Sequence, residues 1–417
     1  MAILVINAGS SSVKFTLFGP DAQTALAGGI VERIGFDGTR LMYRNHREHR
    51  SETLVAVANA DAAVGEVVSA LTHPAHGVLK EIRQVTAVGH RVVHGGEKLT
   101  HPVVVDADVK AYLNECARFA PLHNPHHLKG IEASERHIPA AVQVAVFDTA
   151  FHASVPPHAF LYGLPYRFYR EDHIRRYGFH GISHKYVAEE AARFLGLPLA
   201  GLRLIVCHLG NGCSMAAVKG GHSIDTSMGF TPLEGLIMGT RCGDIDPAAV
   251  LHLMEHRQLG IGAMNDLLNK QSGLLGLAET GSNDLRDILA ARAAGNPQAT
   301  VALEAFCYRI KKYIGSYAAV MGGLDVLVFT AGIGENSPDV RWMACEGLAA
   351  AAGFGIALDP DANAAAGNRP REIQAAGSRV KVLVIPTNEE LEIAREVLQI
   401  INGGAVFGRP EGHEVGI

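Results

Sequence analysis

Residues 3–18 read ILVINAGSSSVKFTLF, and this stretch indicates the fold class. Residues 3–6 are an apolar run typical of a buried strand, and residues 13–18 predict a second strand running back beside it. Residues 7–12, between them, are rich in Asn, Gly and Ser, which favour tight turns. The stretch therefore predicts a β-hairpin that carries a glycine turn.

The same pattern returns later in the chain. Residues 202–207 are followed by the turn HLGNGCS at 208–214 and by a returning strand at 215–218. A third apolar strand, 325–330, leads into AGIGEN at 331–336, which we read as another turn. Two such hairpins predict an internal duplication, with one hairpin at the start of each half.

Helical patterns alternate with these strands. One helix is expected near 184–195, and a longer apolar stripe over 303–317 predicts another that starts at the N-cap pair Asn296-Pro297. Further strands are expected at 85–93, 141–147 and 380–385. A helix at 389–401 could pack on either half. Strands alternating with helices indicate an α/β fold.

Composition excludes several classes of protein. The 417 residues are 48% hydrophobic and 19% charged, with a formal net charge of -5 and scattered basic residues. This argues against a nucleic-acid or membrane-surface protein. No apolar run is long enough to span a membrane, and no signal peptide is expected. The six cysteines are widely spaced without a C-x-x-C motif, which predicts no disulfide framework or zinc site and favours a reducing cytoplasm.

The three glycine turns are candidates for phosphate binding. Converging backbone N–H groups bind phosphate, and glycine permits the close approach. Each turn taken alone is more often an ordinary tight turn, but three at the ends of apolar strands favour a nucleotide site. Neither a P-loop nor a dinucleotide fingerprint is present.

Four charged residues occupy positions suited to catalysis. Asp148 follows the apolar run 142–147, and Arg91 interrupts the apolar run VGHRVV at 88–93. Arg91 needs a partner, which is either a bound anion or a structural ion pair. The alternative to a catalytic role for Asp148 is that it caps a helix or a turn. Arg241 lies in a glycine-flanked loop suited to an exposed cation, and His180, in GFHG, is either catalytic or structural.

The segment TNEE at 387–390 follows the last apolar strand. Thr387 and Glu390 have the spacing of a helix capping box. That arrangement leaves Glu389 available to help hold Mg²⁺, which prefers oxygen ligands.

Nine motifs, in order, together resemble the acetate kinase family: ILVINAGSSSVKF, HRVVHGG, PLHNP, FDTAFH, YGFHGISH, CHLGNGCS, TPLEGLIMGTRCGDIDP, FTAGIGENS and IPTNEELEIA. The resemblance spans nearly the whole chain. It implies the duplicated actin-like, ribonuclease H-like ATPase fold of the acetate and sugar kinase, heat-shock chaperone and actin superfamily, with two α/β domains flanking a nucleotide cleft. The expected domains are 1–150 with about 386–417, and 151–385 as the nucleotide-binding domain.

The resemblance also implies site residues. It places the catalytic cluster at Arg91, Asp148, His180 and Arg241, and an apolar pocket for the acetate methyl group at Val93, Leu122, Phe179 and Pro232. It assigns Mg²⁺ to Asn7 and Glu389, and the first phosphate loop to Ser10, Ser12 and Lys14. The second phosphate loop would be His208, Leu209, Gly210, Asn211 and Gly212, and the adenosine side Asp284, Leu285, Arg286, Ala331, Gly332, Ile333, Gly334 and Glu335. Cys242 stands where the family has serine, which adds a candidate oxidation-sensitive thiol beside Arg241.

The implied activity is reversible transfer of the ATP γ-phosphoryl group to acetate, with Mg²⁺ or Mn²⁺ and ATP/ADP as co-substrate, in a cytoplasmic homodimer. Acetate has no proton to remove, so we expect Asp148 to orient an arginine or a Mg²⁺-bound water rather than to act as a general base. The alternatives are a propionate or other short-chain acyl kinase, a non-catalytic actin-like ATP switch, and a sugar or glycerol kinase.

Overall fold

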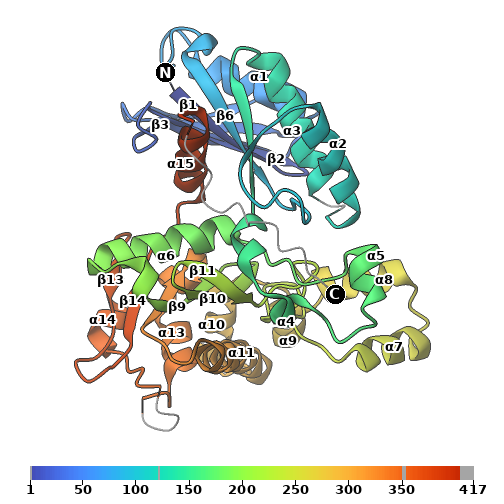
Figure 1. The fold of residues 1–417 in the computed structure, drawn as a ribbon, viewed down its shortest axis with the longest axis vertical. Coiled ribbons are helices and arrows are strands. Elements are labelled where there is room, and N and C mark those ends of the chain that lie inside the picture. The colour runs from blue at the N-terminus through green and yellow to red at the C-terminus, as the bar shows by residue number, and fades with distance from the viewer. Residues whose placement is uncertain (1, 121–122, 350–353, 404–417) are drawn as a thin grey trace, which may run out of the picture. The chain divides into compact units, whose positions relative to one another are not determined.

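The computed structural model describes residues 2–120, 123–349 and 354–403. The chain divides into two compact units, Met1–Phe151 with Asn388–Ile417, and His152–Thr387. Each unit is an α/β structure built on its own sheet (Figure 1). None of the helices in the described part of the chain combines the length and hydropathy of a transmembrane segment.

The sheet of the first unit has eight strands in the order β5-β4-β3-β2-β1-β6-β8-β7. The hairpin expected from residues 3–18 is present as its central pair, and the expected strands near 85–93 and 141–147 are β6 and β8. The strands are β1 (Ala2–Ala8), β2 (Ser12–Phe18), β3 (Ala25–Glu32), β4 (Arg40–Asn45), β5 (Arg50–Leu54), β6 (Val85–Val92), β7 (Val103–Val104) and β8 (Val142–Phe147).

The sheet of the second unit has six strands in the order β11-β10-β9-β12-β14-β13. Its expected hairpin is also present, as β9 and β10. The strands are β9 (Arg203–Leu209), β10 (Cys213–Lys219), β11 (His222–Thr226), β12 (Val326–Thr330), β13 (Arg371–Glu372) and β14 (Lys381–Val384).

Six strands of each unit share one topology. The run β3-β2-β1-β6-β8-β7 matches β11-β10-β9-β12-β14-β13 in order and in the sense of every pairing. In both units three antiparallel strands are followed by two parallel ones and a short antiparallel edge strand. The predicted duplicated α/β fold is confirmed. Strands β4 and β5 are additions to the first unit alone.

Helices cover both faces of the first sheet (Figure 1). Along β1, Leu4 and Ile6 belong to one buried cluster with Val64 and Val67 of α1, while alternate residues point to the other face. On that other face a Cβ at Gly89 would lie 2.7 Å from side chains of α15, so the glycine permits its close packing. The helices are α1 (Ala60–Leu71), α2 (Ala107–Glu115), α3 (Asn124–His137) and α15 (Glu389–Ile401), with 3₁₀ turns Ile82–Gln84 and Cys116–Arg118.

The second unit contains the longest described helix, α11 (Pro297–Met321). Its predicted stripe is buried, and the Asn296 side chain accepts a hydrogen bond from the Ala299 amide, which confirms the predicted N-cap. The other helices are α4 (Pro157–Phe160), α5 (Arg167–Asp172), α6 (Gly181–Leu195), α7 (Pro247–His256), α8 (Ile261–Lys270), α9 (Gly273–Ala278), α10 (Leu285–Ala293), α12 (Ala331–Asn336), α13 (Pro338–Cys345) and α14 (Pro360–Ala364), with 3₁₀ turns Ala150–Ser154 and Leu199–Gly201.

Two local predictions were wrong. The capping residue of α15 is Asn388, whose side chain accepts from the Leu391 amide at 3.1 Å. The Thr387 hydroxyl instead pairs with the Ser183 hydroxyl at 2.8 Å, so the helix begins one residue later than a Thr387 cap requires. The AGIGEN segment is the short helix α12 rather than a turn, entered through Ala331 at a left-handed φ of 62°.

Candidate functional site

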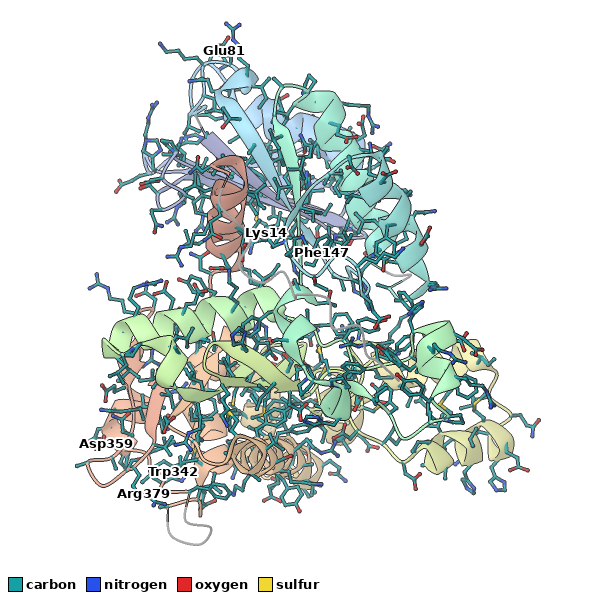
Figure 2. All side chains as sticks on the ribbon, viewed as in Figure 1. Lys14, Glu81, Phe147, Trp342, Asp359 and Arg379 are labelled. Carbon is teal, nitrogen blue, oxygen red and sulfur yellow. The ribbon has the colours of Figure 1, made fainter. Side chains whose placement is uncertain are left out.

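In the first unit, predicted residues gather at the edge where parallel strands β1, β6 and β8 end. Asn7 lies near the end of β1, Arg91 near the end of β6, and Asp148 directly after β8. Lys14 of β2 is opposite Asn7 in the hairpin register. Figure 2 labels Lys14 and Phe147, the last residue of β8, at this end of the sheet. Carboxyl ends of parallel strands are where α/β proteins bind ligands.

Arg91 forms a two-pronged ion pair with Asp148. Its Nε lies 3.1 Å from Oδ1 and its Nη2 lies 2.6 Å from Oδ2. A carboxylate oxygen of Glu389, the first residue of α15, lies 3.7 Å from Nε, and Glu390 pairs with Lys14. The structural ion pair considered for Arg91 is therefore present. With Glu389 beside it, three of the predicted site residues lie together.

Burial and charge oppose each other in this pair. Burial raises the pKa of Asp148 to about 6, against the attraction of Arg91 and with added repulsion from Glu389. Burial alone would lower the pKa of Arg91, but the carboxylates of Asp148 and Glu389 hold it above its ordinary value. Arg91 remains a cation with five N–H donors, and Asp148 engages only Nε and Nη2. The Nη1 group is thus outside the Asp148 fork.

In the second unit, four predicted residues converge. His180 precedes α6 in a left-handed conformation, and its ring stacks on that of His208 with centroids 4.2 Å apart. A Cβ built on Gly212 would lie 3.5 Å from both the His180 ring and Nη1 of Arg241. The turn between β9 and β10 therefore approaches an imidazole and a guanidinium, two groups that can donate hydrogen bonds to an anion.

Arg241 has no ion-pair partner among the residues that the structure describes. Its Nη1 donates to the Pro232 carbonyl at 3.1 Å, and burial lowers the pKa of the guanidinium without removing its charge. A half-buried cation without a carboxylate is costly unless an anion compensates it. The geometry is that of an anion site beside the β9–β10 turn.

The β9–β10 turn is tied to the segment before Arg241. The Gly239 amide donates to the Asn211 carbonyl at 2.9 Å, and the Asn211 side-chain oxygen accepts from Asn283 at 2.6 Å. A Cβ at Gly239 would lie only 1.9 Å from that oxygen. The Gly210 amide closes the turn on the Gly212 carbonyl, so this amide is not available to a phosphate.

The predicted adenosine-side residues form two separate local structures. Asp284 caps α10 and pairs with the exposed Arg286, while Leu285 is buried. Residues 331–335 lie on α12, and the Glu335 carboxylate accepts from the Thr387 amide at 3.1 Å. Their contact with a nucleotide stays a prediction.

The predicted acyl pocket is described in part. Val93 is buried in the first unit, and Phe179 is buried in the second, where Pro232 also lies. Leu122 lies outside the described residues. Cys242 forms a contact from its Sγ to the Gly243 carbonyl, and burial raises the pKa of its thiol. A raised pKa reduces the thiolate fraction, so this residue is less prone to oxidation than we expected.

The oxygen donors in the first unit fit a metal ion that keeps much of its hydration. Among the described residues, no three of His, Cys, Asp and Glu gather into a metal-binding cluster. The amide of Asn7 and the carboxylate of Glu389 are hard oxygen donors at one sheet edge. Mg²⁺ is commonly held by one or two protein oxygens together with substrate phosphates and water, so this sparse set suits it.

The chain is similar to known proteins along almost its whole length. The family model described as "Acetokinase family" matches residues 2–395. This chain belongs to the acetokinase family. The expectation drawn from the nine motifs is confirmed over nearly the whole chain.

Individual relatives cover 95–97% of the chain. An acetate kinase of Desulfitobacterium hafniense is 50% identical over 404 residues, which are 97% of this chain and 100% of the relative. The crystal structure of Porphyromonas gingivalis acetate kinase has a TM-score of 0.91 and 43% identity, covering 96% of this chain and 99% of that one. A propionate kinase from Francisella tularensis has a TM-score of 0.87 and 40% identity, with 95% and 98% covered.

Several residues around this family's motifs were missed by sequence reasoning. Ser214 contacts both His180 and His184, a pair whose i, i+4 spacing on a helix was the available signal. The fully buried Arg341 donates to the Gly334 and Glu335 carbonyls at 2.8 and 3.0 Å, which fixes the end of α12. No sequence pattern pointed to Arg341.

A third missed group holds the irregular segment that carries Pro232 and Arg241. Arg176 donates to the carbonyls of Thr226, Ser227 and Met228 and pairs with Glu234. Tyr162 donates to the same carboxylate and accepts from the Phe230 amide at 2.8 Å. These contacts hold in place a segment that forms no regular helix or strand.

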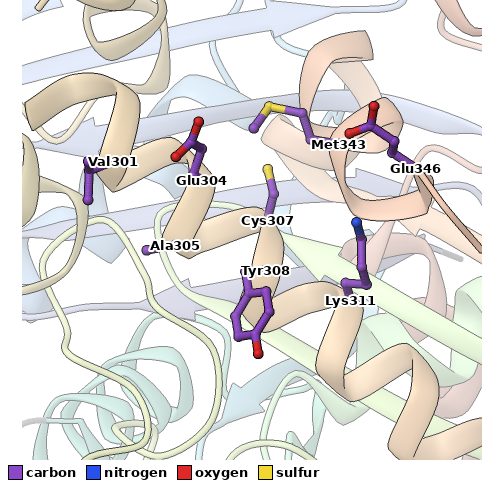
Figure 3. A pocket seen from close by; sticks show the side chains of 8 residues that line it. All are labelled: Val301, Glu304, Ala305, Cys307, Tyr308, Lys311, Met343 and Glu346. Atoms are coloured by element: carbon purple, nitrogen blue, oxygen red, sulfur yellow. The ribbon is translucent and has the colours of Figure 1, made fainter. Parts of the chain in front are cut away.

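A groove of about 410 Å³ lies elsewhere in the second unit, along α11 and the end of α13 (Figure 3). None of its lining residues is a predicted site residue. Burial raises the pKa of the Cys307 thiol in its wall to about 12, so this cysteine is not a nucleophile. The lining is Val301, Glu304, Ala305, Cys307, Tyr308, Lys311, Met343 and Glu346.

Proposed function

We propose that this protein transfers the γ-phosphoryl group of ATP to acetate and, in reverse, from acetyl phosphate to ADP. The observation that carries the proposal is the anion site of the second unit. There Arg241, with no carboxylate partner among the described residues, approaches His180 and the Gly212 turn. The chain's 50% identity to acetate kinases supports acetate as the acceptor.

In the forward reaction an acetate oxygen attacks the γ-phosphorus as the bond to the β–γ bridging oxygen breaks, and ADP departs with that electron pair. Arg241 and His180 donate hydrogen bonds to the equatorial oxygens, where charge accumulates. Arg91 binds the acetate carboxylate through the Nη1 group that Asp148 does not engage. The family resemblance alone assigns the methyl group to Val93, Leu122, Phe179 and Pro232.

Asp148 orients Arg91 in this mechanism. A sugar kinase needs a general base because its acceptor is a hydroxyl, whereas acetate is already ionised at neutral pH. The two hydrogen bonds to Arg91 give the carboxylate a different task, which is to fix the plane of the guanidinium.

Asn7 and Glu389 would hold Mg²⁺. When bound, the ion neutralises phosphate charge during the transfer. Lys14, paired with Glu390, adds a cation near the same end of β1. Chelation by EDTA should abolish turnover, and Mn²⁺ should restore part of it.

The deciding experiment measures acyl phosphate formed from Mg-ATP, trapped as the hydroxamate, with acetate, propionate, butyrate and glycerol. We expect acetate to be the fastest and propionate slower, because one methylene in an apolar pocket is worth about 1–3 kcal/mol. Propionate ahead of acetate would make the protein a propionate kinase. ATP binding without any acyl phosphate would favour the non-catalytic ATP switch.

A further inference from the structure

His180 belongs to a chain of three side chains within the second unit. The Ser214 hydroxyl oxygen on β10 lies 2.9 Å from Nδ1 of His180 and 2.7 Å from Nε2 of His184. His184 sits one turn beyond His180 on α6. A serine hydroxyl has one proton to donate, so it can donate to only one of the two imidazoles and must accept from the other.

The buried environment of His184 decides to which imidazole Ser214 donates its proton. Its side chain is fully buried, and among the described residues its Nδ1 has no hydrogen-bond partner. Burial, with the nearby rings of His152 and His208, lowers the pKa of His184 well below its ordinary value, so the ring is neutral and has one N–H. A buried N–H without an acceptor is rarer and more costly than a buried lone pair without a donor. The proton therefore sits on Nε2, where Ser214 accepts it.

The remaining step follows from the serine. Because Ser214 accepts from His184, its own proton is directed to Nδ1 of His180. We propose that His184 and Ser214 are positioning residues that fix His180 as the tautomer protonated on Nε2. The inference rests on the proposed function, in which that Nε2–H donates to the transferring phosphoryl group.

The opposite tautomer of His180 would leave a buried N–H of His184 without a partner among the described residues. If Nδ1 of His180 carried the proton, Ser214 would accept it and would donate to Nε2 of His184. His184 would then carry its proton on Nδ1, the buried atom that has no partner among the described residues. The hydrogen bond made by one ring nitrogen thus selects the proton position on the other, as is usual for histidine.

The test combines ¹⁵N-histidine NMR with kinetics. His180 is assigned from the resonances missing in His180→Asn. Ser214→Ala removes the hydroxyl and His184→Leu removes the N–H donor of this hydrogen-bonded chain. Ser214→Thr keeps the hydroxyl, and His184→Gln keeps an N–H donor at a similar reach. Ser134→Ala, at a fully buried serine of α3 bonded to the Gly130 carbonyl, is the matched control for serine truncation.

We expect wild-type His180 to show an unprotonated Nδ1 and a protonated Nε2. Ser214→Ala and His184→Leu should mix the tautomers and lower kcat about tenfold, the scale of one hydrogen bond, with little change in the KM for acetate. Ser214→Thr, His184→Gln and Ser134→Ala should stay near wild type in both readouts.

A proton on Nδ1 of His180 in the wild type would overturn the inference. So would an unchanged tautomer and kcat in both Ser214→Ala and His184→Leu. If Ser214→Ala does not fold, the wild-type spectrum and the His184→Leu and His184→Gln pair still decide the question. Failure of the wild-type protein to form any acyl phosphate would refute the proposed function instead, and the NMR result would stand separately from it.

Discussion

Arg91 and Asp148 meet fork to fork, with Nε 3.1 Å from Oδ1 and Nη2 2.6 Å from Oδ2. The Asp148 amide also donates to the Val92 carbonyl at 3.0 Å, so the ends of adjacent strands β6 and β8 hold the pair. Two parallel charge-assisted hydrogen bonds fix the plane of the guanidinium. The orientation of Arg91 therefore depends on the ionisation of Asp148.

This dependence predicts a pH effect. Because burial raises the pKa of Asp148 to about 6, the KM for acetate should rise as the pH falls through that value. Asp148→Asn should raise this KM about tenfold at neutral pH, the scale of a charged hydrogen bond, and remove its dependence on Asp148 ionisation. Initial rates at several acetate concentrations on either side of the pKa measure this. An unchanged acetate KM in Asp148→Asn would contradict it.

The same shift has a stability consequence of opposite sign to the usual carboxylate case. The folded-state pKa lies above the ordinary value of 3.8, so the folded protein binds the proton more tightly than the unfolded chain does. The stabilising contribution is complete below pH 3.8 and is lost as the pH rises to about 6. Urea unfolding at several pH values in this interval should therefore show that the stability of the wild type relative to Asp148→Asn falls as the pH rises.

Arg241→Ala should lower kcat by about 10³ or more, as expected for an arginine that stabilises a transferring phosphoryl group. Arg241→Lys should recover only part of this, because an ammonium cannot reproduce the planar fork. Arg40→Ala, which breaks an exposed ion pair with Glu52 in the first unit, is the matched control. Near-normal turnover in Arg241→Ala would remove this residue from the mechanism.

Gly239→Ala should weaken ATP binding. The added methyl group would lie 1.9 Å from the Asn211 side-chain oxygen. Asn211 must then move, which breaks its hydrogen bond with Asn283 and distorts the β9–β10 turn. We expect the KM for ATP to rise while that for acetate stays the same. Gly201→Ala, where a methyl group meets nothing within 4 Å, separates this effect from the loss of a glycine as such.

Arg341→Met should lower the free energy of unfolding by about 3 kcal/mol, because carbonyls at the end of α12 and on Asn363 lose a charged donor. The variant should also bind ATP less tightly, since α12 carries predicted adenosine-side residues. Urea unfolding and calorimetric titration with ATP measure the two effects. Arg40→Met, at an exposed site, should change neither.

Val93→Ala should move the acyl preference toward propionate. Val93 is only 5% exposed, so truncation opens space for about one or two further carbon atoms. The ratio of kcat/KM for propionate to that for acetate should rise about tenfold, within the range for one methylene. An unchanged ratio would mean that Val93 does not face the acyl group.

Much of the fold followed from local patterns. The hairpins at β1–β2 and β9–β10 and the buried stripe of α11 depend on apolar periodicity and turn residues, which adjacent residues encode. The start of α15 did not follow, because the Thr387 hydroxyl is taken by Ser183, a partner distant in sequence. The helix α12 did not follow either, because its glycine-rich residues also suit a turn and the hydrogen bonds from Arg341 to its Gly334 and Glu335 carbonyls leave no mark in that local pattern.

The site residues also divide into those that the local sequence indicated and those that it did not. Arg91 was singled out because a cation within an apolar run needs a partner, and Asp148 because it follows an apolar strand. The structure pairs the two residues with each other. Arg341 and Ser214 were missed because their importance depends on contacts with segments far along the chain. A buried arginine on a helix and a serine in a strand carry no local signal of what they touch.

The placement of α15 has a consequence for how the protein is made. This last described helix covers the face of the first sheet that includes Val5 and Gly89, yet roughly 240 residues of the second unit are translated in between. At about 5–20 residues per second, the ribosome takes some tens of seconds to synthesise that stretch. During that time the nascent first unit lacks one of its two covering layers, so an apolar surface is open to chaperones until α15 emerges.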